Sequence, residues 1–441
     1  MEKLNILTLH RLGNPRRAVR FLRKHVFFLR DHAPEHNYVY HDVAVHLPDY
    51  VKDIPFDAVI LDVTLLCSRW GQPDVLERCK KEYSFVADLD AVRFAFPQDE
   101  YDCNELLDDW MMEWKVDVVF SVLESHREVL YPRYHEKGEF QLSYCGCLDE
   151  KLLSFQPKPF ADRTIDLGYR ARKLPPYFGR LGQTKWTIGR EVDRLARAAG
   201  LRTDVVLGDG KRLFGNDWIN FINDCKFTLG ANSGSSLLDP RREIQQAVRR
   251  YLADSPDATF EEVEAACFPG QEGKYEFTAI SPRVLETAAL GSGQILVDGA
   301  YSGIVEPWEH YLPIRPDASN FDEVFEAMGD VAEMERMIKR CREAILDCRF
   351  LRYSFQAQRI LDLIRERSGD SRPESHLQGA EAIIAKYERE IGKKNKMLWA
   401  WQDTKSIIAK IPILGPGLRK TMSAFQERTR RKIVARPKTE P

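Results

Sequence analysis

The sequence lacks a long apolar run, an excess of charge of one sign and an even set of cysteines. No window of its 441 residues approaches the roughly 18–20 apolar residues that span a bilayer, and the N-terminus lacks the order of a signal peptide. The formal net charge of −2 creates no long-range field for nucleic acid. The nine cysteines mostly lie in apolar runs, as reduced thiols do. We expect a soluble cytoplasmic protein that binds no nucleic acid.

Positive charge is concentrated at the C-terminal end of the chain. Residues 391–441 contain thirteen Lys or Arg against three Asp or Glu, which is +10, so the remaining chain is close to −12. The basic residues alternate with Trp399, Trp401 and several isoleucines. This mixture is typical of segments that lie on an anionic membrane surface. We therefore predict membrane binding through 391–436, with partner docking or disorder as the alternatives.

The first half of the chain alternates apolar runs with helical patterns. The runs expected as strands are 5–9, 37–45, 56–65, 83–88 and 116–123. Several of them are continuously apolar, as strands buried on both faces are. Strands and helices in repeated succession predict an α/β fold with parallel sheets and right-handed crossovers.

The same succession restarts after about residue 149, so we expect two α/β domains in series. The strands expected in the second domain are 164–168, 202–207, 225–229 and 294–297. The predicted organisation is a first domain at 1–155, a second domain at 156–367 with a helical insertion at 240–271 and closing helices at 322–366, and a basic helical tail at 368–441.

The segment SPRVLETAALGSGQILVDG, residues 281–299, combines a short helix with a buried strand. Ser281 followed by proline is a strong helix start, and Gly291 is a good residue to follow the helix end. A helix N-terminus attracts anions. Arg283 in the first turn therefore favours a phosphate ligand, and Glu286 suits the hydroxyls of a ribose. The alternative is a surface ion pair between Arg283 and Glu286.

Two further groups of residues stand where strands of the second domain end. The small polar residues Ser233, Gly234 and Ser235 follow the strand at 225–229, and loops of this kind approach phosphates or sugar hydroxyls closely. Basic residues at the strand at 164–168 and beyond it are placed for a diphosphate. They are Arg170, Arg172, Arg180 and Lys185. A plain turn and a solvated surface are the alternatives for the two groups.

The segment from about residue 165 to 324 resembles the nucleotide-binding half of glycosyltransferases with the two-domain GT-B fold. It looks most like bacterial surface-polysaccharide enzymes of the glycosyltransferase family 1 kind. In that family a helix of the form R-x-x-E-A-x-A-x-G follows the donor loop, and its arginine, glutamate and glycine positions are matched here by Arg283, Glu286 and Gly291. The family's D-S-N-x-D/E-E turn is matched loosely at 317–323.

The resemblance implies two Rossmann-like domains that face each other across a cleft, with Glu286 on the ribose of a nucleotide-sugar. It also implies a hexosyltransferase that needs no metal or other cofactor, because a helix dipole and basic residues stabilise the leaving diphosphate. The sequence departs from the family at Thr278. Many relatives carry a glutamate there, so the stereochemical outcome of the reaction stays open.

Candidates for the acceptor side lie in the first half. His126 follows the strand at 116–123 and is therefore expected at the carboxyl edge of the sheet, where it could act as a general base near neutral pH. A hydrogen-bonded structural histidine is the alternative. Glu124 is a second candidate on this side. His310, in the second half, is expected to contact the donor or to pack within its loop.

Together these patterns predict a glycosyltransferase that moves a sugar from a nucleotide-sugar donor to a glycan or lipid-linked acceptor. The expected role is the synthesis of cell-surface polysaccharide or lipopolysaccharide, at the inner face of the cytoplasmic membrane. Two alternatives stay open: a nucleotide-sugar 2-epimerase of the same fold, and a non-catalytic scaffold of a glycan-assembly complex.

Overall fold

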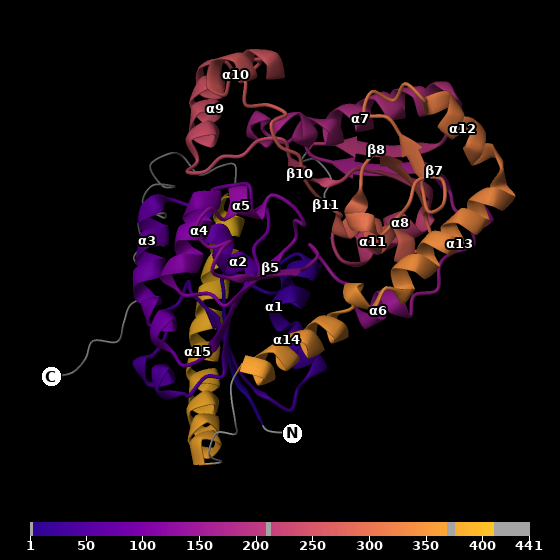
Figure 1. Cartoon of the computed structure of the whole chain (residues 1–441). Helices are drawn as coiled ribbons and strands as arrows, with labels where there is room; N and C mark the ends of the chain where they lie inside the picture. Colours follow the sequence, from indigo (N-terminus) through magenta and orange to yellow (C-terminus); the bar gives the residue numbers. More distant parts are fainter. Residues whose placement is uncertain (1–2, 209–212, 368–374, 410–441) are drawn as a thin grey trace. The chain divides into compact units, whose positions relative to one another are not determined.

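The computed structural model describes residues 3–208, 213–367 and 375–409, and the chain forms two compact units (Figure 1). One unit contains Met1–Phe96, Glu113–Val119 and Ala357–Pro441, and the other contains Pro97–Met112 and Phe120–Gln356. The sequence predicted a division between residues 155 and 156, whereas these units are made of several pieces of the chain. Pieces of the first half belong to the second unit, and the C-terminal end of the chain belongs to the first unit.

The first sheet has the strand order β2-β1-β3-β4-β5-β6. β1 pairs in parallel with both β2 and β3, and the pairs β3–β4 and β4–β5 are parallel as well. The strands are β1 (Asn5–His10), β2 (Asn37–Asp42), β3 (Ala58–Leu61), β4 (Val92–Ala95), β5 (Val118–Ser121) and β6 (Glu139–Leu142). The helices of this half are α1 (Arg20–His32), α2 (Val63–Leu66), α3 (Pro73–Glu82), α4 (Asn104–Glu113) and α5 (Arg127–Leu130).

The strand expected at 83–88 is wrong, because Ser84–Asp88 forms a short 3-10 helix and the strand is β4. Arg93 interrupts the apolar run of β4 and hides it in the sequence. Its side chain is buried, and its Nε donates to the carbonyl of Val86 at 2.9 Å. A buried guanidinium is tolerated where its donors are satisfied, so β4 keeps its place in the core.

The second sheet has the strand order β13-β12-β9-β7-β8, and all four of its pairs are parallel. Its first strand, β7, lies between β8 and β9, so the order reverses there. The strands are β7 (Ile165–Ala171), β8 (Thr203–Leu207), β9 (Cys225–Gly230), β12 (Gly293–Val297) and β13 (Leu312–Ile314). A separate antiparallel ribbon is formed by β10 (Ser233–Ser235) and β11 (Phe277–Ala279). Two largely parallel sheets with helices confirm the α/β class.

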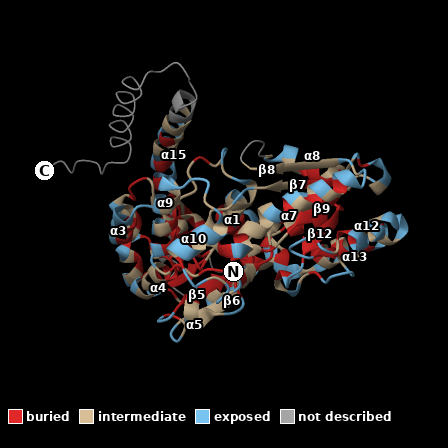
Figure 2. Cartoon of the chain, turned by 90° about the horizontal axis from the view of Figure 1, so that it is seen from above, coloured by how far each residue is buried: buried red, intermediate tan, exposed pale blue. Residues whose placement is uncertain are grey.

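Helices of the second unit pack on both faces of this sheet, whose central strands β9 and β12 are buried (Figure 2). Met334 and Met337 lie in the core with Leu167 and Phe227, as apolar residues rather than ligands. The helices from here onward are α6 (Glu150–Leu153), α7 (Gly179–Ala198), α8 (Asn216–Asp224), α9 (Glu243–Asp254), α10 (Phe260–Cys267), α11 (Pro282–Ala289), α12 (Phe321–Gly329), α13 (Val331–Asp347), α14 (Tyr353–Arg367) and α15 (Ser375–Ala409).

A buried arginine joins the elements at the amino end of this sheet. Arg163, which precedes β7, is 2% exposed. Its guanidinium donates to the carbonyls of Cys225 (2.8 Å) and Leu290 (3.0 Å) and to the hydroxyl of Ser292 (2.6 Å). Leu290 ends α11 and Cys225 follows α8, so one side chain fixes the C-terminal ends of both helices.

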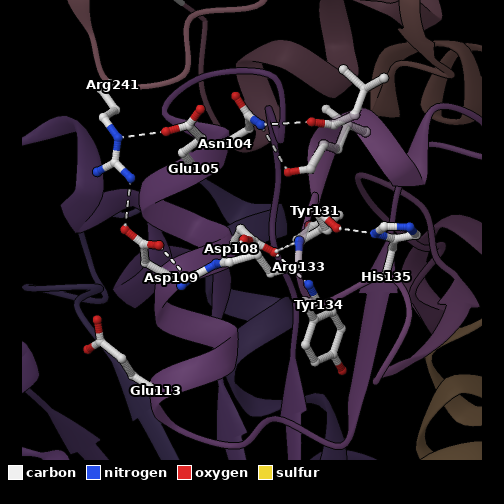
Figure 3. A network of polar contacts seen from close by, with 12 residues as sticks. Asn104, Glu105, Asp108, Asp109, Glu113, Tyr131, Arg133, Tyr134, His135 and Arg241 are labelled. Carbon is white, nitrogen blue, oxygen red and sulfur yellow. Dashed lines mark hydrogen bonds and ion pairs between the residues drawn. The ribbon is translucent and has the colours of Figure 1, made fainter.

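The segment 240–271, which the sequence predicted as a helical insertion, contains α9 and α10. It begins next to α4, where Arg241 bridges two carboxylates: its Nε lies 2.6 Å from Glu105 and its Nη2 lies 3.2 Å from Asp109 (Figure 3). Arg133 pairs with Asp108 on the same helix at 3.0 Å. Both arginines offset the charge of an acidic helix face, and Arg241 also fastens the start of the insertion to α4.

The C-terminal helix α15 packs on the first unit through buried residues, including Ile384, Tyr387 and Leu398. The Tyr387 hydroxyl donates to the carbonyl of Tyr40 (3.0 Å) and lies 2.9 Å from Nδ1 of His41. Residues 391–409 of the predicted membrane segment therefore belong to a helix docked on the protein, and 410–436 lie outside the described residues. Within the described part of the chain, no helix has the length and apolarity to cross a bilayer.

Two tyrosine hydroxyls link α15 to the rest of the first unit, and we expect their removal to change the free energy of unfolding by different amounts. Tyr387→Phe leaves the buried Nδ1 of His41 without this partner, so we expect a loss of about 1–3 kcal/mol in the free energy of unfolding. Tyr50→Phe is the matched control, because its hydroxyl meets Glu390 on the surface and should cost at most about 0.5 kcal/mol. Urea unfolding measures both. Equal losses would show that the buried contact does not hold α15.

Candidate functional site

Arg283 lies across the end of the first strand of the second sheet. It is the second residue of α11, and its Nη1 donates to the carbonyl of Arg170 at 2.6 Å. The guanidinium carbon lies 5.7 Å from the ring centroid of Tyr169 and 5.3 Å from that of Trp218. These contacts place a half-buried cation near the point where the strand order reverses between β7 and β9, the usual ligand position in open α/β sheets.

Glu286 is oriented by the same tryptophan. Its Oε2 accepts a hydrogen bond from Nε1 of Trp218 at 2.8 Å. Trp218 stands in the first turn of α8 and is half-buried. The two charged residues of α11 therefore share one indole, which touches Arg283 through its face and Glu286 through its N–H. Figure 1 shows α8 and α11 adjacent in the second unit.

Lys185 adds a second cation at this place. It lies on α7, and its Nζ is 3.3 Å from the hydroxyl of Ser233, at the start of the ribbon that follows β9. Burial, and after it the charge of Arg283, lower the pKa of Lys185 to about 8, and the charge of Asp99 opposes this shift. In the described part of the chain, neither Lys185 nor Arg283 forms an ion pair. Lys185 and Arg283 are thus two neighbouring cations whose repulsion and burial lower the free energy of unfolding of the protein.

The amide groups at the start of α11 are less available than the sequence suggested. The Ser281 side chain accepts from the N–H of Arg283 at 3.4 Å, and its carbonyl accepts from the N–H of Val284 at 2.9 Å. The N-cap prediction is confirmed. Because these donors are already used, an anion here would be held mainly by the side chains of Arg283 and Lys185 and by the helix dipole.

Two of the predicted basic residues lie elsewhere. Arg170 points along the sheet, pairs with Asp204 at 2.7 Å and lies 3.9 Å above the ring of Phe221. Its guanidinium is therefore engaged in holding β7 to β8, and only its carbonyl reaches Arg283. Arg172 follows the end of β7 and is exposed.

The N-terminus of α7 is occupied by carboxylates of the insertion and the segment after it. The Arg180 guanidinium pairs with Glu261 (3.1 Å) and Glu264 (2.8 Å) of α10. The Arg180 N–H donates to Glu272 at 3.2 Å. At Gly179 a Cβ would lie 2.1 Å from the Ser236 hydroxyl, and φ is +67°, so only glycine fits this helix start. The protein itself thus supplies acidic groups to a helix end that attracts anions.

The predicted loop of small residues is a strand rather than a turn. Ser233, Gly234 and Ser235 form β10 and pair with Ala279, Thr278 and Phe277 of β11 in that order. Ser235 is buried, and its hydroxyl donates to the carbonyls of Phe178 and Leu237. Of the three residues, Ser233 contacts a charged residue of the site, Lys185.

His126 lies at the predicted position after β5, in the second unit. It precedes α5 with φ +64°, and the Ser125 hydroxyl lies 2.8 Å from its Nδ1. Its ring packs edge-on against Tyr275 (5.8 Å) and Phe277 (5.4 Å). This places the imidazole beside the strand that leads into α11. Glu124 is exposed, two residues before it.

Two predicted donor residues are not brought to Arg283. Gly291 lies at the other end of α11, where φ of +66° confirms that it follows the helix end. His310 precedes β13, and its Nδ1 accepts from the N–H of Glu306 at 3.0 Å. A residue before a parallel strand lies at the amino edge of the sheet, and Arg283 lies at the carboxyl edge. The packed-loop alternative therefore describes His310.

Sequence reasoning missed Trp218 and Glu272. Trp218 interrupts the polar face of a short amphipathic helix, which is a signal that could have found it. Glu272 comes from a segment distant in sequence, and the contact it makes depends on the fold, so no pattern along the chain marks it.

No family model matches this chain, and no curated protein matches it in sequence. Among solved structures, an α-glucosyltransferase in complex with UDP and a 13-mer DNA is 10% identical, with a TM-score of 0.48 over 82% of this chain and 100% of that chain. A glycosyltransferase from Rickettsia africae is 10% identical, with a TM-score of 0.45 over 84% of this chain and 100% of that chain. Anabaena Alr3699/HepE in complex with UDP is 9% identical, with a TM-score of 0.47 over 82% of this chain and 100% of that chain.

The lowered pKa of Lys185 predicts how stability depends on pH. The unfolded chain keeps this proton up to about 10.5 and the folded chain only up to about 8, so the unfolded state binds more protons between these values and stability rises with pH there. Lys185→Met should remove that rise and add about 1–3 kcal/mol below pH 8.

Denaturant unfolding at pH 7 and pH 10 measures this effect. Lys173→Met is the matched control, because Lys173 is exposed and its removal should leave the pH dependence as it is. A Lys185→Met protein that is no more stable than wild type at pH 7 would contradict a strained cation at this position.

Proposed function

We propose that this chain is a GT-B type glycosyltransferase that moves a hexose from a nucleotide-sugar to a glycan or lipid-linked acceptor. The observation that supports it best is the pair Lys185 and Arg283. Burial and mutual repulsion lower the pKa of Lys185, so the free protein bears a cost that a multiply charged anion would relieve. A diphosphate at the carboxyl edge of the sheet meets that requirement.

The remaining groups suit the rest of such a donor. Trp218 holds the carboxylate of Glu286 in a fixed orientation, from which it can accept hydrogen bonds from two ribose hydroxyls. As the glycosidic bond to phosphate breaks, negative charge grows on the leaving diphosphate, and Lys185 and Arg283 stabilise it there. These cations provide the charge compensation that a metal ion supplies in other transferases, so we propose a metal-independent reaction without a cofactor.

His126 is our candidate for the acceptor side. Ser125 contacts its Nδ1, and Nε2 is the nitrogen that would take the proton from the acceptor hydroxyl as the new bond to the sugar forms. Tyr275 and Phe277 hold the ring in place. Since Glu124 is exposed two residues away, it is our second candidate for this role.

We also propose that the enzyme acts in cell-surface polysaccharide or lipopolysaccharide synthesis, bound peripherally at the inner face of the cytoplasmic membrane. The support is on α15, where Lys393, Lys396 and Met397 are exposed on a helix docked through its other side. Basic and apolar groups exposed together favour binding to anionic lipid.

The donor site predicts the effect of one substitution. In a thermal-shift screen with UDP-, GDP-, dTDP- and CMP-sugars, we expect at least one to stabilise the wild type, by about 2.7 kcal/mol at a hundred times its Kd. Glu286→Ala should abolish the shift while the circular dichroism spectrum stays unchanged, because it removes the ribose contact.

Glu326→Ala is the matched control, since Glu326 is exposed on α12. If Glu286→Ala binds the sugar nucleotide as the wild type does, Glu286 is not a donor residue. Turnover of the donor without any acceptor would instead favour an epimerase, and failure of every nucleotide to bind would favour a scaffold.

The carboxylates around Arg180 predict a gain of affinity. The double variant Glu261→Gln, Glu264→Gln releases the guanidinium from two exposed ion pairs, which are weak. Arg180 then becomes available to the diphosphate, and we expect the Kd of the nucleoside diphosphate to fall about two- to fivefold. Calorimetry at low salt measures it, with Glu326→Gln as the control. An unchanged Kd would mean that Arg180 takes no part in binding.

A further inference from the structure

Asn232 carries a buried carboxamide at the carboxyl edge of the second sheet. It comes shortly after β9 and directly before Ser233, which contacts Lys185. It is 7% exposed, and its Oδ1 has no hydrogen-bond partner among the described residues. Buried amide groups are normally paired with protein, water or a ligand, because an unpaired one lowers stability. The other buried amide oxygens without a partner in the described part of the chain lie on helices, at Asn104, Gln245, Gln356 and Asn395.

The protein fixes Asn232 between the ends of two central strands. The Tyr301 hydroxyl donates to the carbonyl of Val297, the last residue of β12, at 2.6 Å, and it accepts from the backbone N–H of Asn232. A Cβ at Gly299 would lie 2.5 Å from Nδ2 of Asn232, so glycine leaves the room that this amide occupies. Gly299 itself is exposed. A ligand at the carboxyl edge can therefore approach the amide.

The donor-site residues and Asn232 follow one another along this edge. The strands β8, β7, β9 and β12 are neighbours in that order (Figure 2), about 4.8 Å apart. Trp218 stands at the start of α8, which follows β8, and it binds Glu286. Arg283 lies across the end of β7, and Asn232 lies between the ends of β9 and β12. A sugar nucleotide with its ribose at Glu286 and its diphosphate at Arg283 thus extends its sugar toward Asn232.

We propose that Asn232 determines which sugar the enzyme accepts, through hydrogen bonds between its carboxamide and hydroxyl groups of the donor hexose. The proposal rests on the proposed function. A carboxamide offers one acceptor and two donors, which suits neutral hydroxyl groups, whereas cations suit the diphosphate. A site whose buried polar group needs a partner selects a sugar that supplies one and rejects a sugar that lacks the matching hydroxyl. The unpaired Oδ1 of the free protein is the group that the correct sugar completes.

Isothermal titration calorimetry on the full-length protein separates the sugar from the rest of the donor. The ligands are UDP-glucose, UDP-galactose, UDP-N-acetylglucosamine and GDP-mannose, with UDP and GDP as the ligands without a sugar. In Asn232→Leu, which nearly keeps the size of the side chain, we expect the Kd of the sugar nucleotide that the wild type binds most tightly to rise about two- to tenfold. The Kd of the matching nucleoside diphosphate should stay unchanged. Asn232→Ala supplies the same comparison should leucine not be accommodated.

Urea unfolding without ligand distinguishes a binding role from a structural one. Asn232→Leu removes an unpaired amide, so its urea midpoint should equal or exceed that of the wild type. Asn320→Leu is the matched control, because its amide is paired at both ends: Oδ1 accepts from the N–H of Arg315 at 2.8 Å, and Nδ2 donates to the carbonyl of Pro313 at 3.0 Å. The midpoint of this control should fall while its affinity for the sugar nucleotide is retained.

Three results would overturn the proposal. An equal rise in the Kd of the sugar nucleotide and of the nucleoside diphosphate would mean that Asn232 acts on the nucleotide. Unchanged Kd values for every ligand would mean that the amide is paired with water. A urea midpoint that falls as far in Asn232→Leu as in Asn320→Leu would show a structural role. Each of these leaves the proposed function standing, whereas a wild type that binds no sugar nucleotide contradicts that function and this proposal with it.

Discussion

The position of Trp218 and Arg283 in the candidate site depends on Arg163. This arginine is nearly fully buried, and its guanidinium is satisfied by carbonyls and a hydroxyl rather than by a carboxylate. Burial lowers the pKa of Arg163 to about 10, so it stays charged, and the carbonyl ends of helices are favourable for a cation. Because it fixes the C-terminal ends of α8 and α11 together, the other ends of these helices carry Trp218 and Arg283 at a set separation. The indole contacts at the site follow from a charge at the opposite edge of the sheet.

The two cations of the site illustrate a conflict between stability and function. A lysine that is half-buried beside an arginine lowers the stability of the empty protein, and an apolar residue there would pack at less cost. Two other basic side chains of the second unit have carboxylate partners: Arg170 has Asp204 and Arg180 has two glutamates of α10. Lys185 and Arg283 form no ion pair within the described residues, and the lowered pKa of Lys185 favours a binding role.

The sequence was sufficient for features that are local. The α/β class, the N-cap Ser281, the helical insertion and the strands with uninterrupted apolar runs follow from periodicity and capping, which act over a few residues. The sequence was not sufficient where the role of a residue depends on a contact with a distant part of the chain. Arg93 conceals β4 until its carbonyl partners are known, and Arg170 cannot be told from Arg283 until the strand pairing shows which side chain faces Asp204. Likewise nothing local in the basic, tryptophan-rich end of the chain reveals that α15 docks on the first unit.

The insertion that contains α9 and α10 lies between the paired strands β10 and β11, and this pairing keeps the residues around Lys185 and Arg283 in place. β10 and β11 pair on either side of it, with Gly234 opposite Thr278. A Cβ at Gly234 would lie 1.8 Å from the carbonyl of Phe277, so glycine allows the two backbones to approach closely. Once this pairing closes the base of the loop, its length has little influence on the residues outside it, since the entropy of a closed loop grows slowly with length. Ser233 therefore meets Lys185, and Thr278 stands three residues before Ser281, whatever helices lie between. The same closure lets α10 present its glutamates to Arg180 without moving α11.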